Sequence, residues 1–224
     1  ICDIRRSMGH LRLKIEESEP EKKARTRPRR FAPAGQSTQM IVGADGADDD
    51  AILARSENLY GSFRLKRVYY SAFSPIPDSS SRLPLARPPL MREHRLYQAD
   101  WLLRFYGFER SEIVAGGTDG MLDLAIDPKL AWALKNRERF PVDVNRADRE
   151  MLLRVPGFGT KSVTRILSTR RHKTLRLDDI ARLCQSVAKV RPFISALDWT
   201  PGGLTDSARL RDALVPPAQQ LSLF

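Results

Sequence analysis

The chain has 224 residues, 42% of them hydrophobic, so it can bury a core and is neither a short peptide scaffold nor a chain disordered throughout. Its 38 Lys and Arg residues exceed its 27 Asp and Glu residues and give a net charge of +11, which favours a polyanionic partner if the charges share one surface. It has no run of about eighteen apolar residues and no export signal, so we expect no membrane association and a cytoplasmic location.

The excess charge is concentrated in one part of the chain. Residues 129–195 hold 16 basic and 6 acidic residues, and so account for +10 of the net +11. This concentration indicates a single module that faces a nucleic acid, whereas an ordinary solvated helical surface is the alternative.

Two segments precede the first predicted strand. Over residues 1–19, apolar side chains recur every three or four residues and predict a helix with one apolar face, formed by Ile4, Met8, Leu11 and Ile15. Residues 20–38 lose this period among prolines and basic residues, and predict a surface loop. Because the chain begins with Ile1 within the helical pattern, we expect an amino-terminal part to be missing.

A βαβ unit is predicted next. The apolar run over residues 39–43 ends in Gly43 and is followed by three aspartates, 48–50, which are suited to the start of a helix. A second apolar run covers residues 67–73. Strands joined by a helical crossover are parallel, and the faces of a parallel sheet need to be covered.

Helical segments follow this unit. Residues 74–90 contain five prolines and predict an extended loop. Residues 92–106 regain a helical face, and residues 109–126 predict a short helix and a glycine-rich turn. At Asp127-Pro128, a capping carboxylate precedes a proline, which predicts the start of another helix.

A helical hairpin is predicted over residues 144–167. In this interpretation Asn145 caps the first helix, Pro156-Gly157 ends it and Gly159 opens the second. The turn resembles that of the helix-hairpin-helix family of DNA-binding modules. In that family the turn has the sequence pattern hydrophobic-Pro-Gly-hydrophobic-Gly, followed by a short polar run. The sequence departs from that pattern at Val163, where the family usually has a small residue.

The hairpin predicts a phosphate-binding site. Glycines let the backbone approach an anion, and the second helix turns its unpaired N–H groups toward it. Such contacts ignore base identity, so we expect binding that is independent of sequence and strongly dependent on salt. An ordinary helical hairpin is the alternative. The candidate DNA-binding residues are Gly157, Phe158, Gly159, Thr160, Lys161 and Ser162. Residues 177–193 predict a degenerate second hairpin that packs against the first.

Residues 31–194 are similar to proteins described as putative DNA modification or repair radical S-adenosylmethionine (SAM) proteins. The similarity is carried by residues 40–80, with a strand that ends in glycine, an acidic helix start and a strand that leads into Ser-Pro-Ile-Pro, together with residues 31–39 and 92–108. The resemblance implies the later part of a radical SAM barrel, in which Gly43 lines the cofactor pocket. Residues 39–73 as part of another α/β sheet are the alternative.

The resemblance also implies cofactors. Members of that family hold a [4Fe-4S] cluster and S-adenosylmethionine through a CxxxCxxC loop, which this sequence lacks. Cys2 and Cys184 have no companion, and with three histidines they make no four-ligand zinc site. We therefore expect no cofactor and no radical chemistry on this chain alone.

The carboxyl-terminal pentapeptide forms a second candidate site. It looks like the motif by which bacterial DNA-processing enzymes dock on the sliding clamp, and consists of Gln220, Leu221, Ser222, Leu223 and Phe224. In that mode the leucines and the phenylalanine enter apolar pockets, and the glutamine amide makes directional hydrogen bonds. A tail that folds back over a local apolar patch is the alternative.

These features predict an α/β part followed by an all-α part. The expected domains are the end of a radical SAM barrel with a helical extension over 1–127, a helix-hairpin-helix domain over 128–195 and a tail over 196–224. The predicted function is a DNA-binding part of a radical SAM protein that acts in DNA modification or repair and docks on the clamp. A non-enzymatic adaptor that links DNA to the clamp is the alternative, and an upstream CxxxCxxC would favour the enzyme. An RNA-binding protein is less favoured, because no stacking platform is visible.

Overall fold

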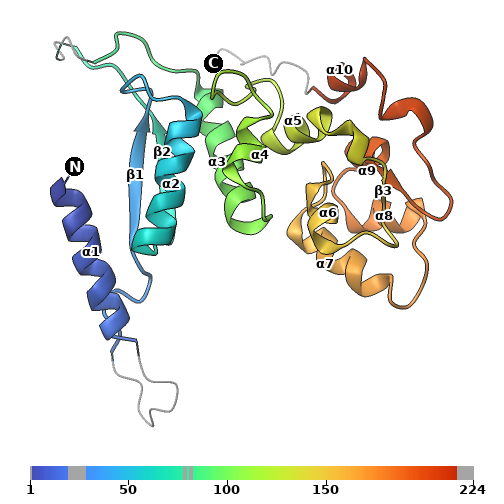
Figure 1. Ribbon diagram of the computed structural model, residues 1–224, viewed down its shortest axis with the longest axis horizontal. Helices are drawn as coiled ribbons and strands as arrows, with labels where there is room; N and C mark the ends of the chain where they lie inside the picture. The colour runs from blue at the N-terminus through green and yellow to red at the C-terminus, as the bar shows by residue number, and fades with distance from the viewer. Residues whose placement is uncertain (1, 20–28, 78–79, 81–82, 216–224) are drawn as a thin grey trace, which may run out of the picture. The chain divides into compact units, whose positions relative to one another are not determined.

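The computed structural model describes residues 2–19, 29–77, 80 and 83–215. Over these residues the chain is mixed α/β, with two small parallel sheets among its helices (Figure 1). It divides into two compact units, Ile1–Tyr97 and Gln98–Phe224. The predicted boundary at residues 127 and 128 falls within the second unit, and the three predicted domains stay a prediction.

The first unit is built around a βαβ element. Its elements are α1 (Cys2–Glu17), β1 (Ser37–Val42), α2 (Asp49–Phe63), β2 (Arg67–Ala72) and the first half of α3 (Leu90–Phe105). The strands are parallel and in register from Ser37 opposite Arg67 to Val42 opposite Ala72. The predicted crossover is therefore confirmed, although β1 begins two residues before the predicted run.

The two faces of this sheet differ. Val42, Val68 and Tyr70 are buried, and the Tyr70 hydroxyl lies 2.8 Å from the Ser56 hydroxyl on α2, which covers that face. At the alternate positions Ile41 and Tyr69 are exposed. This alternation follows from the two-residue period of a strand.

Side chains close the outer edge of β2. The N–H of Val68 donates to the Tyr60 hydroxyl at 3.0 Å, and the N–H of Ala72 donates to Glu93 at 2.8 Å. Between them the Tyr97 hydroxyl accepts from the N–H of Tyr70 and donates to its carbonyl, both at 3.0 Å. The amides that another strand would use are thus occupied, and β2 ends the sheet on this side.

The aspartates before α2 have separate roles. Asp48 caps the helix, because its carboxylate accepts from the N–H of Ala51 at 2.7 Å. Asp49 is buried and pairs with Arg92 of α3 at 2.7 Å, and Arg92 also donates to the Ala47 carbonyl. The predicted helix start is confirmed, and one of its acids also holds α3.

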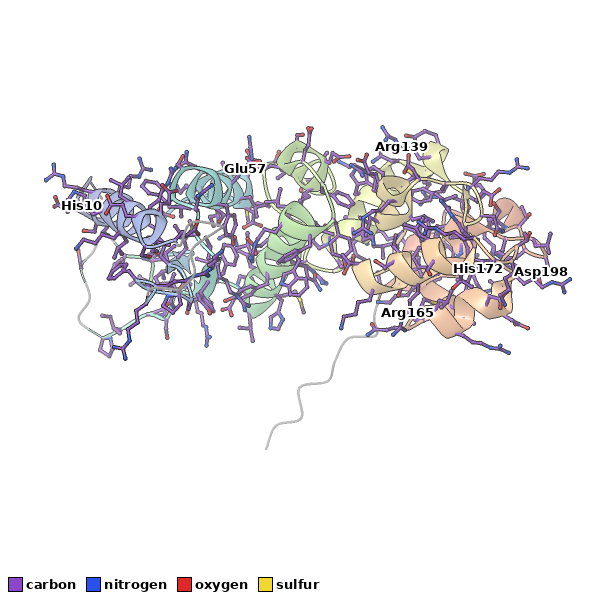
Figure 2. The ribbon with its side chains drawn as sticks, turned by 90° about the horizontal axis from the view of Figure 1, so that it is seen from below. His10, Glu57, Arg139, Arg165, His172 and Asp198 are labelled. Carbon is purple, nitrogen blue, oxygen red and sulfur yellow. The ribbon has the colours of Figure 1, made fainter. Side chains whose placement is uncertain are left out.

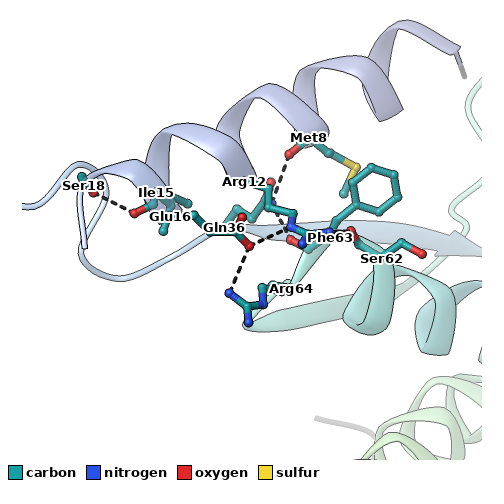
Figure 3. A network of polar contacts seen from close by, with 9 residues as sticks. All are labelled: Met8, Arg12, Ile15, Glu16, Ser18, Gln36, Ser62, Phe63 and Arg64. Atoms are coloured by element: carbon teal, nitrogen blue, oxygen red, sulfur yellow. Dashed lines mark hydrogen bonds and ion pairs between the residues drawn. The ribbon is translucent and has the colours of Figure 1, made fainter. Parts of the chain in front are cut away.

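A polar network fastens α1 to the turn between α2 and β2 (Figure 3). Glu16 accepts from Arg12 at 2.8 Å and from Arg64 at 3.0 Å, and these hydrogen bonds and charges lower the pKa of Glu16. Arg12 also donates to the Ser62 carbonyl, and the Gln36 amide bridges the carbonyls of Met8 and Phe63. A cavity of about 550 Å³ lies beside this network. The predicted helix is confirmed, but its predicted apolar face is confirmed only in part: Met8 is buried, whereas Ile4 and Leu11 are exposed.

The second unit is mostly helical. Its regular elements are the second half of α3, α4 (Arg110–Val114), α5 (Pro128–Lys135), η1 (Arg137–Arg139), β3 (Val142–Asp143), α6 (Arg149–Arg154), α7 (Thr160–Thr169), α8 (Leu177–Leu183), α9 (Val187–Val190), η2 (Arg191–Phe193), β4 (Ile194–Ser195), η3 (Gly202–Leu204) and α10 (Leu210–Leu214). The start of α5 is as predicted, since Asp127 accepts from the N–H of Leu130 at 2.9 Å and Pro128 follows it.

Two features organise the core of this unit. The rings of Phe108, Trp132, Phe140 and Phe193 meet edge to face in a continuous series, at centroid distances of 5.1 to 6.2 Å. Strands β3 and β4 pair in parallel and bring the start of the hairpin segment beside the end of η2. Within the described ranges, no helix is long and apolar enough to cross a membrane.

Candidate nucleic-acid interface

The predicted hairpin is formed by α6, the turn over residues 155–159 and α7. Asp148 caps α6 by accepting from the N–H of Met151 at 2.7 Å, so the prediction that Asn145 caps this helix is wrong. The Asn145 amide instead donates to the Leu175 carbonyl at 3.1 Å and accepts from its N–H at 2.8 Å. Asn145 therefore ties the start of the hairpin to the loop before α8.

Gly157 is required by the turn for two reasons. Its φ of +89° lies in the left-handed region, which favours glycine. A Cβ at this position would also lie 2.7 Å from Cγ2 of Val190 and 3.4 Å from Cβ of Lys189, both on α9. The turn thus packs directly on α9.

Phe158 supports the fold of the turn and leaves no group for a ligand. Its side chain is buried, and its N–H donates to the Val155 carbonyl at 3.1 Å. Its carbonyl accepts from Lys129 Nζ at 2.6 Å. The prediction that Phe158 contacts DNA is therefore corrected: its side chain anchors the turn in the core.

Several backbone N–H groups in the turn and at the start of α7 have no acceptor among the described residues. They belong to Gly157, Gly159, Lys161 and Ser162. These residues are exposed or half-buried, and α7 has no acidic residue in its first turn. Because a helix start carries a partial positive charge, these N–H groups form a suitable place for an anion.

The backbone N–H of Thr160, the first residue of α7, faces Tyr106. Burial raises the pKa of the Tyr106 hydroxyl, and hydrogen bonding from the Thr160 backbone partly offsets this effect. The Tyr106 ring also covers Lys129, whose Nζ lies 4.8 Å from the ring centroid. Tyr106 and Lys129 together form the inner wall of the turn.

Exposed cations surround the unoccupied amides. Lys161 and Arg165 lie four residues apart on α7 and so share a face, and Lys189 lies beside Gly157 (Arg165 is labelled in Figure 2). Some other basic residues of this unit stabilise the fold. Arg154 pairs with Glu112 at 2.9 Å, and Arg170 donates to the Ala147 carbonyl at 2.6 Å.

The predicted cofactor residue lies in the first unit. Gly43 has a φ of +79°, and a Cβ there would lie 2.7 Å from Cγ of Pro88. The loop before α3 therefore covers this glycine closely. A [4Fe-4S] cluster held by three thiolates does not fit a chain with two cysteines, and burial raises the pKa of Cys184, which disfavours its thiolate.

The predicted partner-binding residues, Gln220, Leu221, Ser222, Leu223 and Phe224, lie outside the described residues. Comparisons of this chain with protein-family models, with curated proteins and with solved structures found no match.

Four residues of the interface, Arg165, Lys189, Tyr106 and Lys129, are not among the site residues that the sequence predicts. Lys189 is one of several basic residues in its segment, and only the contact of α9 with Gly157 places it at the turn. Tyr106 belongs to the helical face predicted over residues 92–106, and nothing in the sequence connects it with the turn. Lys129 stands among apolar residues near the start of α5, which is the one sequence feature that could have drawn attention to it.

Proposed function

We propose that this chain binds duplex DNA through the sugar-phosphate backbone. The observation that carries the proposal is a set of N–H groups at Gly159, Lys161 and Ser162 that have no acceptor in the described part of the chain. They lie next to the exposed cations Lys161, Arg165 and Lys189. N–H groups and ammonium or guanidinium groups bind phosphate oxygens without reading bases. We expect binding of unrelated sequences with equal affinity, weakened steeply by salt.

We further propose that this DNA-binding hairpin belongs to a radical SAM protein of DNA modification or repair, and that the tail docks on the sliding clamp. The family part rests on the sequence resemblance and is supported by the parallel βαβ unit, whose closed outer edge at β2 suits the last strand of a larger sheet. The clamp part rests on the terminal pentapeptide. A chain with two cysteines equally suits a non-enzymatic adaptor, and iron content in protein from the whole gene separates the two.

The DNA proposal is tested by fluorescence anisotropy with a labelled duplex. Gly159→Asp places a carboxylate among the N–H groups, at a position where the nearest atom to a Cβ is the Tyr106 hydroxyl at 3.7 Å, an ordinary contact distance. We expect this variant and Lys161→Glu each to weaken binding by at least about tenfold.

Matched controls carry the same charge changes elsewhere. Gly203→Asp lies where a Cβ has open space, and Lys14→Glu lies on α1 of the first unit. Both should bind as the wild type does. Undiminished affinity in Gly159→Asp and Lys161→Glu, or equal losses in the controls, would remove the hairpin from the proposed function.

A further inference from the structure

The peptide group between Phe158 and Gly159 has its two ends in different surroundings. This peptide bond is trans, so its C=O and N–H point in opposite directions. The C=O is held inside by Lys129 Nζ at 2.6 Å, and the Gly159 N–H on the other side has no acceptor among the described residues. Lys129 thus fixes the orientation of an N–H group that the proposed function assigns to phosphate.

Lys129 is an unusual residue for this position. Its side chain is buried, although an ammonium group is costly to remove from water. The titratable groups that face it are Asp127, which caps the same helix, and Tyr106, whose ring it contacts. Burial lowers the pKa of Lys129 to about 7, and the charge of Asp127 opposes that effect.

A charged Lys129 strengthens the Gly159 N–H as a donor. An ammonium group on a carbonyl polarises the whole peptide group, because hydrogen bonds that share one peptide reinforce each other. A phosphate on the outer side in turn favours the positive charge on the inner side. The two groups are therefore coupled through a single peptide.

We propose that Lys129 is a positioning residue for phosphate, which holds the Gly159 N–H outward and takes up a proton when a phosphate binds there. This inference rests on the proposed function and adds its regulation by pH. The bond that forms is N–H on Lys129, the proton comes from the buffer, and no covalent bond of the protein breaks.

The direction of the pH effect follows from linkage. Because binding favours the protonated form, the pKa of Lys129 is higher in the complex than the value of about 7 in the free protein. Affinity is then highest well below this pH, falls as the pH rises through it, and levels off above the pKa of the complex. A rise of one unit on binding corresponds to an about tenfold loss of affinity across that window.

The wild type alone provides the first test. Calorimetry of duplex binding at about pH 7.5, in two buffers of different ionisation enthalpy, measures the protons taken up. We expect net uptake that decreases at higher pH. Binding without proton uptake would overturn the inference and leave the proposed function standing, whereas absence of binding at low salt would contradict the proposed function itself.

Variants assign the proton to Lys129. Lys129→Met keeps the length and removes the charge, and we expect weaker binding with a flat pH profile between about pH 6 and 9. His172→Gln, which removes an exposed histidine after α7, should keep the wild-type profile. An unchanged pH profile in Lys129→Met would overturn the inference. If that variant fails to fold, the pH titration of the Gly159 amide resonance in the free wild type replaces it, and the absence of a midpoint near 7 would count against the inference.

Discussion

Gly157 combines a left-handed backbone with a close contact, and the two effects can be separated. Gly157→Ala meets both the positive φ and Val190 at 2.7 Å, whereas Gly202→Ala meets a φ of +58° in open space. We expect Gly202→Ala to cost about 1 kcal/mol of unfolding free energy and Gly157→Ala about 1–3 kcal/mol more.

Denaturant unfolding followed by tryptophan fluorescence measures this difference, because Trp101, Trp132 and Trp199 all belong to the second unit. Equal losses in the two variants would show that α9 does not confine the turn.

Lys129 also makes stability depend on pH. Its pKa is about 7 in the folded chain and 10.5 when exposed, so between these values the unfolded chain binds more protons. The free energy of unfolding therefore rises with pH through this window. Below the window, the full cost of burying a charged Lys129 lowers the stability of the folded chain. Between about pH 7 and pH 9, the free energy of unfolding of the wild type should rise by about 2 kcal/mol relative to that of Lys129→Met. Parallel stability profiles of the two proteins would contradict this prediction.

At the scale of elements, the closed edge of β2 depends on α3. Tyr97→Phe removes the hydroxyl that both accepts from and donates to the Tyr70 backbone. Because this leaves two polar groups of the strand without partners, we expect a loss of about 1–3 kcal/mol in the first unit.

Amide hydrogen exchange at Tyr70 measures this loss. Tyr69→Phe, on the exposed face of the same strand, is the matched control and should leave the exchange unchanged. Slow exchange at Tyr70 in both variants would show that the strand edge does not need α3.

The elements that the sequence predicted well are those with local signals. Asp127-Pro128 starts a helix through one carboxylate and one missing N–H, and the βαβ unit follows from apolar runs with a helical segment between them. The prediction for the cap of α6 is wrong because two capping residue types, Asn145 and Asp148, stand three positions apart. The Asn145 side chain is hydrogen-bonded to the backbone of Leu175, a partner 30 residues away that no local pattern reveals.

The candidate site was predicted only on its outer side. The glycines and Lys161 follow a motif that local spacing can show. The inner side consists of Lys129 and Tyr106, which reach the turn from α5 and from the end of α3. Phe158 was assigned to DNA because spacing gives the position of a side chain along the chain and not the side of the turn that it occupies.

At the scale of the whole molecule, some basic residues make contacts within the fold, and others are exposed where a partner could bind. Arg154 and Arg170 are used in internal contacts, whereas Lys161, Arg165 and Lys189 are exposed around the turn. Replacing these three by glutamine should reduce the slope of log affinity against log salt by about 3, since each phosphate contact contributes about 0.9. An unchanged slope would place the DNA contacts on other basic residues.

The central claim is that the start of α7 presents backbone N–H groups to phosphate, and amide resonances measure it directly. In a titration of the isotope-labelled chain with an arbitrary duplex, we predict the largest shifts at Gly157, Gly159, Lys161 and Ser162. The start of α2 is the internal control, since its Asp48, Asp49 and Asp50 repel an anion. Shifts confined to other regions, or equal at the two helix starts, would contradict the account.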